Sequence, residues 1–298
     1  MSDTTESLRR KLAGAGDLQA VVRAMKALAA SNIGQYRKSL LALTGYVRTV
    51  ELGLGACFRA RELAMSPSPP RSHAGAVCTV VFGSDQGLVG RFNDVVAVDA
   101  AEALGPTKRT TKVWAVGERI AARLADEGIT ATGVFEVPGA VDAISRLVGQ
   151  ILVATETADG NDEASELHLF YNKSTSGAGY APVRQRLLPL DLAWRRTLAE
   201  APWPTKQVPQ VMGSNATTLR SLLREYLFVS IFRACAESLA SENASRLAAM
   251  QRADKNIDEL LKTLHGAFQR VRQSGIDEEL FDVVSGFEAL RPENGRVG

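Results

Sequence analysis

Residues 237–290 read ESLASENASRLAAMQRADKNIDELLKTLHGAFQRVRQSGIDEELFDVVSGFEAL and contain no proline. Apolar or small side chains recur at spacings of three and four from Ala236 to Val271. A heptad-like pattern sustained for this long predicts one helix that buries a stripe of side chains against a partner helix. The whole proline-free stretch 210–291 would extend on the order of 110 Å at 1.5 Å per residue. A helix of this length needs a partner along its stripe to be stable.

The expected partner lies at the other end of the chain. Residues 1–66 also lack proline, and residues 25–54 show the same spacing of apolar and small side chains. Proline costs about 3 kcal/mol inside a helix, and ten of the eleven prolines fall within residues 67–209. We therefore expect the two terminal helices to form a long antiparallel coiled coil with the middle of the chain inserted between them. Asn243 and Asp254 interrupt the stripe, and they either fix its register or lie at its solvated edge.

The middle of the chain alternates between strand and helix patterns. Buried strands are predicted at VCTVVF (77–82), KVWAV (112–116) and ELHLFY (166–171), with helices near 91–104, 117–127 and 138–157 and a further edge strand at 183–190. This alternation predicts an α/β, Rossmann-like domain with a largely parallel sheet. The expected boundaries are a helix at 1–66, the α/β domain at 67–201, a proline-rich linker at 202–213, a helix at 214–291 and a tail at 292–298.

The composition excludes several classes of protein. The chain has 298 residues and a net charge of +2, which argues against a dedicated nucleic-acid binder. We expect no membrane-spanning helix, because no apolar run reaches about 18 residues, and the first residues do not resemble a signal peptide. The three scattered cysteines predict reduced packing residues of a cytoplasmic protein rather than a metal site: Cys57, Cys78 and Cys235.

Candidate catalytic motifs are weak. The glycine-rich turn GSDQGLVGRFN, residues 83–93, has neither a GK[ST] ending nor the GxGxxG spacing of a phosphate cradle. We interpret it as a tight turn from strand to helix in which small residues allow close backbone approach. His73, His168 and His265 have no spacing that suggests a metal site or a catalytic triad. The sequence therefore predicts no catalytic residues, no metal and no cofactor.

The C-terminal end of the last helix is apolar around most of its circumference. Its large apolar residues are Leu280, Phe281, Val283, Val284, Phe287 and Leu290. Such a surface has to be enclosed, either by the same chain folding back or by a sleeve that other subunits supply. Residues 1–65 carry ten Lys and Arg against five acids, which fits either a basic shaft inside an acidic sleeve or a solvated face.

Three segments resemble the gamma subunit of F-type ATP synthases: VVRAMKALAAS (21–31), GSDQGLVGRFN (83–93) and residues 237–290. The resemblance implies a non-catalytic rotor that binds no nucleotide and couples ion flow through the membrane to ATP synthesis or hydrolysis. The implied partners are a ring of alpha and beta subunits, the epsilon subunit and the membrane c-ring. It also implies a peripheral membrane protein on the cytoplasmic face of a prokaryotic cell membrane, without insertion into the membrane.

The resemblance also carries over individual residues. Met25, Lys26, Glu242, Arg246, Met250 and Gln251 fall where the shaft meets the ring, and the apolar tip to be seated in its bearing includes Leu280, Phe281, Val284, Phe287 and Leu290. Gly87, Gly90 and Asn93 mark the turn of the middle domain. Departures from the family pattern at Gln86, Val89, Arg91 and Phe92 predict a divergent branch, with an alternate type of synthase as the candidate. The competing hypotheses are a small-molecule-binding α/β protein and a coiled-coil scaffold outside energy coupling.

Overall fold

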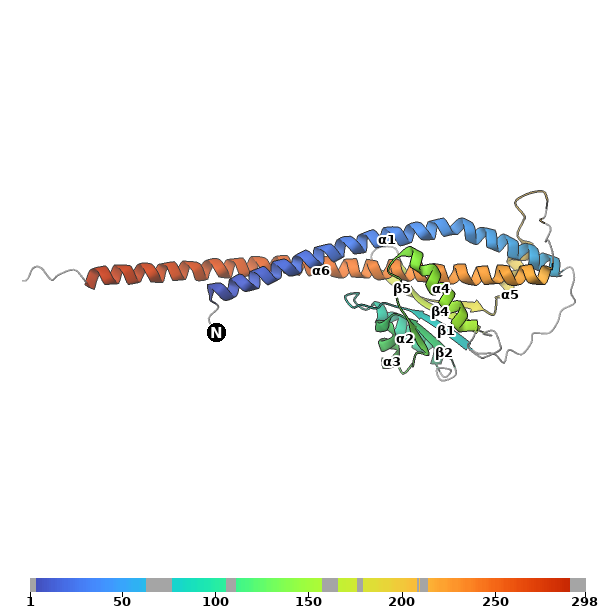
Figure 1. Ribbon diagram of the computed structural model, residues 1–298, viewed down its shortest axis with the longest axis horizontal. Helices are drawn as coiled ribbons and strands as arrows, with labels where there is room; N and C mark the ends of the chain where they lie inside the picture. Colours follow the sequence, from blue (N-terminus) through green and yellow to red (C-terminus); the bar gives the residue numbers. More distant parts are fainter. Residues whose placement is uncertain are drawn as a thin grey trace, which may run out of the picture. The chain divides into compact units, whose positions relative to one another are not determined.

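The computed structural model describes residues 4–62, 77–105, 111–156, 166–175, 179–207, 209 and 214–289 (Figure 1). Contacts divide the chain into two compact units. The stalk unit combines residues 1–27 with 250–298, and the sheet unit comprises residues 28–249. Two long helices, α1 (Thr5–Glu62) and α6 (Asn215–Ala289), contribute to both units. The linker predicted at 202–213 and the tail at 292–298 lie partly or wholly outside the described residues.

The sheet unit is built on five strands in the order β3-β2-β1-β4-β5. The strands are β1 (Val77–Phe82), β2 (Lys112–Val116), β3 (Gly133–Phe135), β4 (Glu166–Ser174) and β5 (Tyr180–Leu188). The first four strands pair in parallel, and β5 pairs antiparallel to β4 at the edge. The three predicted buried strands and the edge strand are confirmed. The sheet is mixed, however, because the short connection from β4 to β5 allows only an antiparallel hairpin.

Helices cover both faces of this sheet (Figure 1). On one face, α2 (Phe92–Leu104) and α3 (Glu118–Asp126) share a buried apolar cluster with β1, β2 and β4. On the other face, α4 (Val141–Glu156) and α6 pack against the sheet, and α1 adds the ring of Tyr36. The strands read as continuous apolar runs because both faces are buried.

Two elements were not predicted from the sequence. Strand β3 has only three residues, which is too short to produce a hydrophobic pattern. Helix α5 (Leu192–Glu200) begins at Asp191, whose carboxylate accepts a hydrogen bond from the backbone N–H of Ala193 at 2.9 Å. An acidic N-cap before a helix-forming run is a recognisable start signal. The end of α1 packs on α5 and α6 through a third apolar cluster that includes Leu54 and Phe58.

The stalk unit confirms the predicted coiled coil. On α1, the buried residues Leu8, Ala15 and Val22 recur every seven positions. They face a stripe on α6 in which Met250 and Ile257 are buried. The guanidinium of Arg9 lies 6.0 Å from the ring centroid of Phe268, whereas residues near position 26 of α1 contact residues near position 254 of α6. The two helices are therefore antiparallel.

The apolar content of α1 exceeds the sequence expectation. By length and composition alone, one window of this helix could span a membrane, although only 22% of that window is buried in the chain. One window of this kind is weak evidence for a membrane span, and the end of α1 buries Val50, Leu54 and Phe58 against its own chain. All three cysteines are buried and none of them forms a disulfide, which fits the expectation that they are packing residues.

Candidate partner-binding surfaces

Asp254 is the centre of a polar cluster in the stalk unit. Its carboxylate accepts hydrogen bonds from the Lys26 ammonium at 2.6 Å and from the Arg23 guanidinium at 3.2 Å. The Gln19 carboxamide also donates to Asp254, at 3.4 Å, and to Asp258. The bond from Lys26 holds the pKa of Asp254 below its ordinary value, and Arg23 adds to this effect. Polar pairs at seam positions favour one register over its alternatives, so the register interpretation of Asp254 fits this geometry better than a solvated edge.

Met25 lies beside the seam rather than in it. The buried seam of α1 runs through Val22, and Lys26 reaches α6 as an ion pair, while Met25 is half-buried. Two other large apolar residues, Leu18 and Val21, are more than half exposed and lie on the helix face of Met25, at spacings of three and four. The sequence analysis did not single out these two residues. Together with Met25 they form an apolar stripe on the accessible side of α1, here called the outer stripe.

Two of the four C-terminal residues that the resemblance placed with Met25, Met250 and Gln251, differ in exposure. Met250 is 2% exposed and belongs to the buried seam. Gln251 is exposed on α6 and has its side chain free to reach a partner.

Glu242 and Arg246 form an ion pair inside the sheet unit. The Arg246 Nη2 atom donates to Glu242 Oε1 at 2.7 Å, and both side chains are largely buried. Burial raises the pKa of Glu242 to about 6, although Arg246 opposes the shift, and the negative charge of Asp85 adds to it. The second carboxylate oxygen of Glu242 has no hydrogen-bond partner among the described residues. Glu242 therefore faces the interior of its own chain, where it also contributes to the raised pKa of Tyr36, about 12, after burial.

The turn at residues 83–93 is closely packed and held by hydrogen bonds. The carboxamide of Asn93 accepts a hydrogen bond from the Ser84 backbone N–H at 3.0 Å and donates to Ser84 Oγ at 2.9 Å. A Cβ atom on Gly83 would lie 2.2 Å from Cβ of Ile120, so no larger residue fits there. Gly90 has a φ of +60°, which glycine adopts without strain. The interpretation as a close-packed turn from strand to helix is confirmed. A Cβ atom on Gly87, however, would meet only the Arg119 side chain, at 3.9 Å.

Two side chains connect this turn to the rest of the sheet unit. Asp85 accepts hydrogen bonds from the backbone N–H groups of Glu118 at 3.0 Å and Val137 at 2.9 Å. Ser245 on α6 donates to the carbonyl oxygen of Val89 at 2.5 Å. The turn therefore fixes α3, the segment after β3 and α6 relative to one another. Sequence reasoning did not find Asp85 or Ser245 because their partners are distant in the chain.

The apolar end of α6 is exposed over its described part. Ile276, Leu280, Phe281, Val283, Val284 and Phe287 are between 48% and 73% exposed. Leu290 lies outside the described residues. None of these side chains is buried, so the described residues do not support the alternative that the chain folds back over this surface. An exposed apolar surface of this size on a helix end indicates a protein-interaction site.

These observations define the class of the protein: it combines a pair of long helices with an α/β domain, and both long helices carry exposed apolar side chains. Among the described residues, no group of three or more His, Cys, Asp or Glu side chains is arranged to hold a metal ion.

The comparisons with known proteins extend over nearly the whole chain. The family model described as ATP synthase matches residues 4–290. The ATP synthase gamma chain of Granulibacter bethesdensis is 29% identical, with 96% of this chain and 99% of the relative covered. The gamma chain of Mycolicibacterium paratuberculosis is 30% identical, with 97% and 99% covered.

Solved structures share the fold. The rotor of the Euglena gracilis mitochondrial ATP synthase matches with a TM-score of 0.63 at 14% identity, covering 91% of this chain and 98% of that one. The central stalk and c-ring structure of the Tetrahymena thermophila enzyme matches with a TM-score of 0.55 at 21% identity, covering 78% and 99%.

The chain belongs to the ATP synthase gamma family: it is the gamma subunit, the non-catalytic rotor that forms the central stalk of an F-type ATP synthase. The two competing hypotheses, a small-molecule-binding α/β protein and a scaffold outside energy coupling, are thereby excluded as the main function. The comparisons do not assign the chain to an alternate-type branch.

Proposed function

We propose that the stalk unit turns inside a ring of alpha and beta subunits and contacts the ring through Met25, Lys26 and Gln251. The support is the exposure of the outer stripe, in which Leu18 and Val21 are more than half exposed and Met25 is half-buried. Lys26 keeps part of its surface accessible although it is paired with Asp254. Glu242 and Met250 are buried in the chain itself. We propose that these two residues, with Arg246, support the shape of the shaft rather than touch the ring.

The apolar tip, residues 276–290, is proposed to sit in a hydrophobic bearing at the top of the ring. The single observation that carries this proposal is the exposure of six large apolar side chains on the last turns of α6. Burying a side chain such as Phe or Leu contributes about 1.5–3 kcal/mol, so enclosure of this tip would stabilise the assembled complex substantially.

The tip is tested by the double substitution Phe281→Asp and Phe287→Asp in the complete synthase complex. We expect weaker assembly of the ring around the rotor and a lower ratio of ion transport to ATP hydrolysis. Glu278→Gln is the matched control, because it changes an exposed polar residue of the same helix segment. Deletion of residues 276–298 should act in the same direction without unfolding the sheet unit. Normal assembly and coupling in both variants would exclude the bearing.

The outer stripe is tested by Met25→Lys in the complete complex. A charge placed in an apolar contact loses its hydration without gaining a partner, so we expect a lower ratio of ion transport to ATP hydrolysis. Ala20→Lys adds the same charge at an exposed position on another face of α1 and serves as the control. Equal coupling ratios in the Met25 variant and the parent protein would remove Met25 from the contact surface.

The remaining partners are proposed from the family. Structures of the Tetrahymena relative contain the central stalk with its c-ring, and a further Euglena structure contains the F1 part with the c-ring. We propose that the sheet unit of this chain faces the epsilon subunit and the c-ring, on the cytoplasmic face of the cell membrane. Co-purification of these subunits with the tagged chain from membranes tests this placement, and its recovery without any of them would contradict it.

A further inference from the structure

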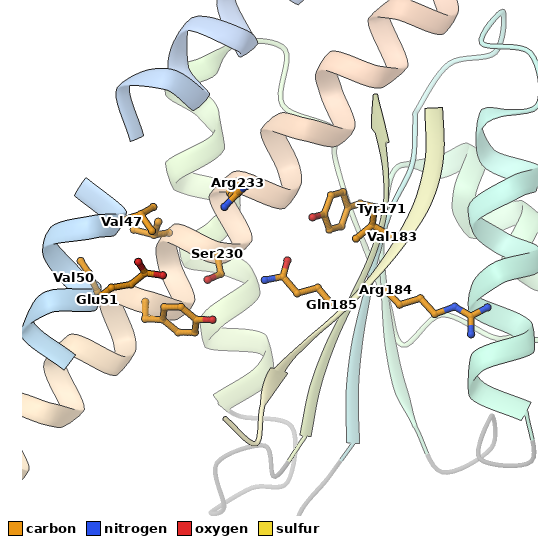
Figure 2. Close-up of a pocket in the computed structure, with 11 residues that line it drawn as sticks. Val47, Val50, Glu51, Tyr171, Val183, Arg184, Gln185, Ser230 and Arg233 are labelled. Atoms are coloured by element: carbon orange, nitrogen blue, oxygen red, sulfur yellow. The ribbon is translucent and has the colours of Figure 1, made fainter. Parts of the chain in front are cut away.

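A cavity of about 310 Å³ lies within the sheet unit, where α1, α6 and the β4–β5 hairpin meet (Figure 2). Its walls come from three elements that are far apart in the sequence. Glu51 belongs to α1, Ser230 and Arg233 belong to α6, and Gln185 belongs to β5. Figure 2 shows the carboxylate of Glu51 and the carboxamide of Gln185 on opposite sides of the cavity. The volume holds about ten water-sized groups.

The negative charge in this cavity is not neutralised by a direct contact. Glu51 forms no hydrogen bond or ion pair of standard length among the described residues, although Arg233 is near enough to act on it electrostatically. The Nε atom of Arg233 donates to Glu237 Oε1 at 3.1 Å, and Lys173 pairs with the same oxygen at 3.3 Å. Burial raises the pKa of Glu51 above its ordinary value, as expected for a carboxylate without a close partner. Glu51 is therefore the carboxylate at the cavity wall with which a cationic occupant can pair.

The remaining walls define the shape and polarity of an occupant. Val47, Val50 and Val183 supply apolar surface, and the Gln185 carboxamide supplies a hydrogen-bonding group. The Ser230 side chain is hydrogen-bonded to Tyr226, which also lines the cavity. Arg184 contributes to the wall near its backbone, while its guanidinium points away and pairs with Asp99 on the other face of the sheet, at 2.9 and 2.7 Å (Figure 2). Small-molecule sites combine apolar walls with a few convergent polar groups in this way.

We propose that this cavity binds a small organic cation, a primary amine on an apolar body of about ten non-hydrogen atoms, whose ammonium group pairs with Glu51. The apolar body contacts the valine side chains, and the amide oxygen of Gln185 accepts a second hydrogen bond from the ammonium. Because the occupant touches α1, α6 and β5 together, its binding stabilises the sheet unit by mass action. This site is independent of the contacts proposed for the ring and the membrane sector.

The test uses the full chain and three probes of matched shape: cyclohexylmethylamine, cyclohexylmethanol and cyclohexanecarboxylate. Binding is measured by isothermal titration calorimetry near pH 8 and by the shift of the thermal unfolding midpoint. We expect saturable binding of the amine with a Kd on the order of 1 mM, and binding of the alcohol and the carboxylate at least about tenfold weaker.

Two variants locate the site. Glu51→Gln removes the charge with little change in shape, and it should weaken amine binding roughly tenfold or more. Val47→Phe places a larger side chain at the wall and should abolish binding through lost volume. Glu259→Gln, at an exposed position on α6, is the control and should bind like the parent chain. Circular dichroism verifies the fold of each variant. If one variant does not fold, the amine affinity of the other variant tests the proposal.

Three results would overturn the proposal. The first is the absence of saturable amine binding to the parent chain. The second is unchanged amine affinity in the folded variants. The third is binding of the alcohol or the carboxylate that equals or exceeds binding of the amine. Such binding of the alcohol would mean that the site recognises apolar shape, and such binding of the carboxylate would mean that Arg233 rather than Glu51 holds the ligand.

Discussion

Replacing Glu242 by Gln should stabilise the sheet unit at neutral and alkaline pH. Burial raises the pKa of this carboxyl group from 4.5 to about 6, even with Arg246 beside it. A shift of this size corresponds to about 2 kcal/mol of preference for the neutral form in the folded protein. Gln resembles the neutral acid in shape and still offers an oxygen to Arg246. We therefore expect the variant to be about 1–2 kcal/mol more stable than the parent chain at pH 8.

The pH dependence follows from the direction of the shift. Below the ordinary glutamate pKa, Glu242 is protonated in both the folded and the unfolded chain, so the variant and the parent should have equal stability. As pH rises from about 4.5 to about 6, the unfolded chain releases this proton before the folded chain does, and the parent loses stability. Above that window the difference stays constant.

The assay is urea unfolding of the full chain, followed by circular dichroism, at pH values from 4.5 to 8. Glu259→Gln removes an exposed carboxylate on the same helix and should change stability little at any pH. A difference between the Glu242 variant and the parent that does not vary with pH would refute the reasoning. A variant that is less stable at pH 8 would also refute it, because the ion pair with Arg246 would then outweigh the cost of burying the charge.

Two further predictions concern the stalk unit and the turn. Asp254→Asn should lower the thermal unfolding midpoint of the chain at low salt, because it removes the ion pairs with Lys26 and Arg23. The difference from the parent chain should shrink near 0.5 M salt, because screening weakens these pairs in the parent. Equal midpoints at low salt would contradict this prediction. Gly83→Ala should reduce the free energy of unfolding by about 2–4 kcal/mol because the added methyl group meets Ile120. Gly139→Ala, which has open space, is its control in the same urea titration, and equal effects would contradict the steric reason.

Local patterns predicted most of the secondary structure. Proline distribution and heptad spacing found α1 and α6, and continuous apolar runs found β1, β2 and β4. The details of the coiled coil were less accessible to sequence reasoning. The spacing of apolar residues placed Met25 in the seam. In the structure the seam runs through Val22 instead, and Lys26 forms an ion pair across it. Gln19 and Lys26 occupy seam positions with polar side chains, so hydrophobicity alone could not find them.

The resemblance predicted which residues belong to the candidate contact surfaces. It could not predict which of these residues are buried in the chain itself. Nothing in the local sequence distinguishes buried Glu242 from exposed Gln251, since both are polar residues on one long helix. Their difference arises because α6 lies against both the sheet and α1 in the sheet unit, and such contacts depend on the whole fold. The unpredicted Ser245 and Asp85 show the same limit, because each bonds to a backbone group of a distant segment.

The buried polar side chains of α6 suit a helix that transmits torque. Apolar contacts are non-directional, so a helix held only by them can rotate or slide at little cost. Within the sheet unit, Ser241 lies 3.0 Å from Ser174 of β4, Lys173 pairs with Glu237 at 3.3 Å, and Ser245 bonds to the turn after β1. Each of these bonds exists in one rotational setting of α6, and breaking it leaves a buried polar group unsatisfied. A rotor needs this resistance to slippage between its helix and its sheet more than it needs the small extra stability that apolar replacements would provide.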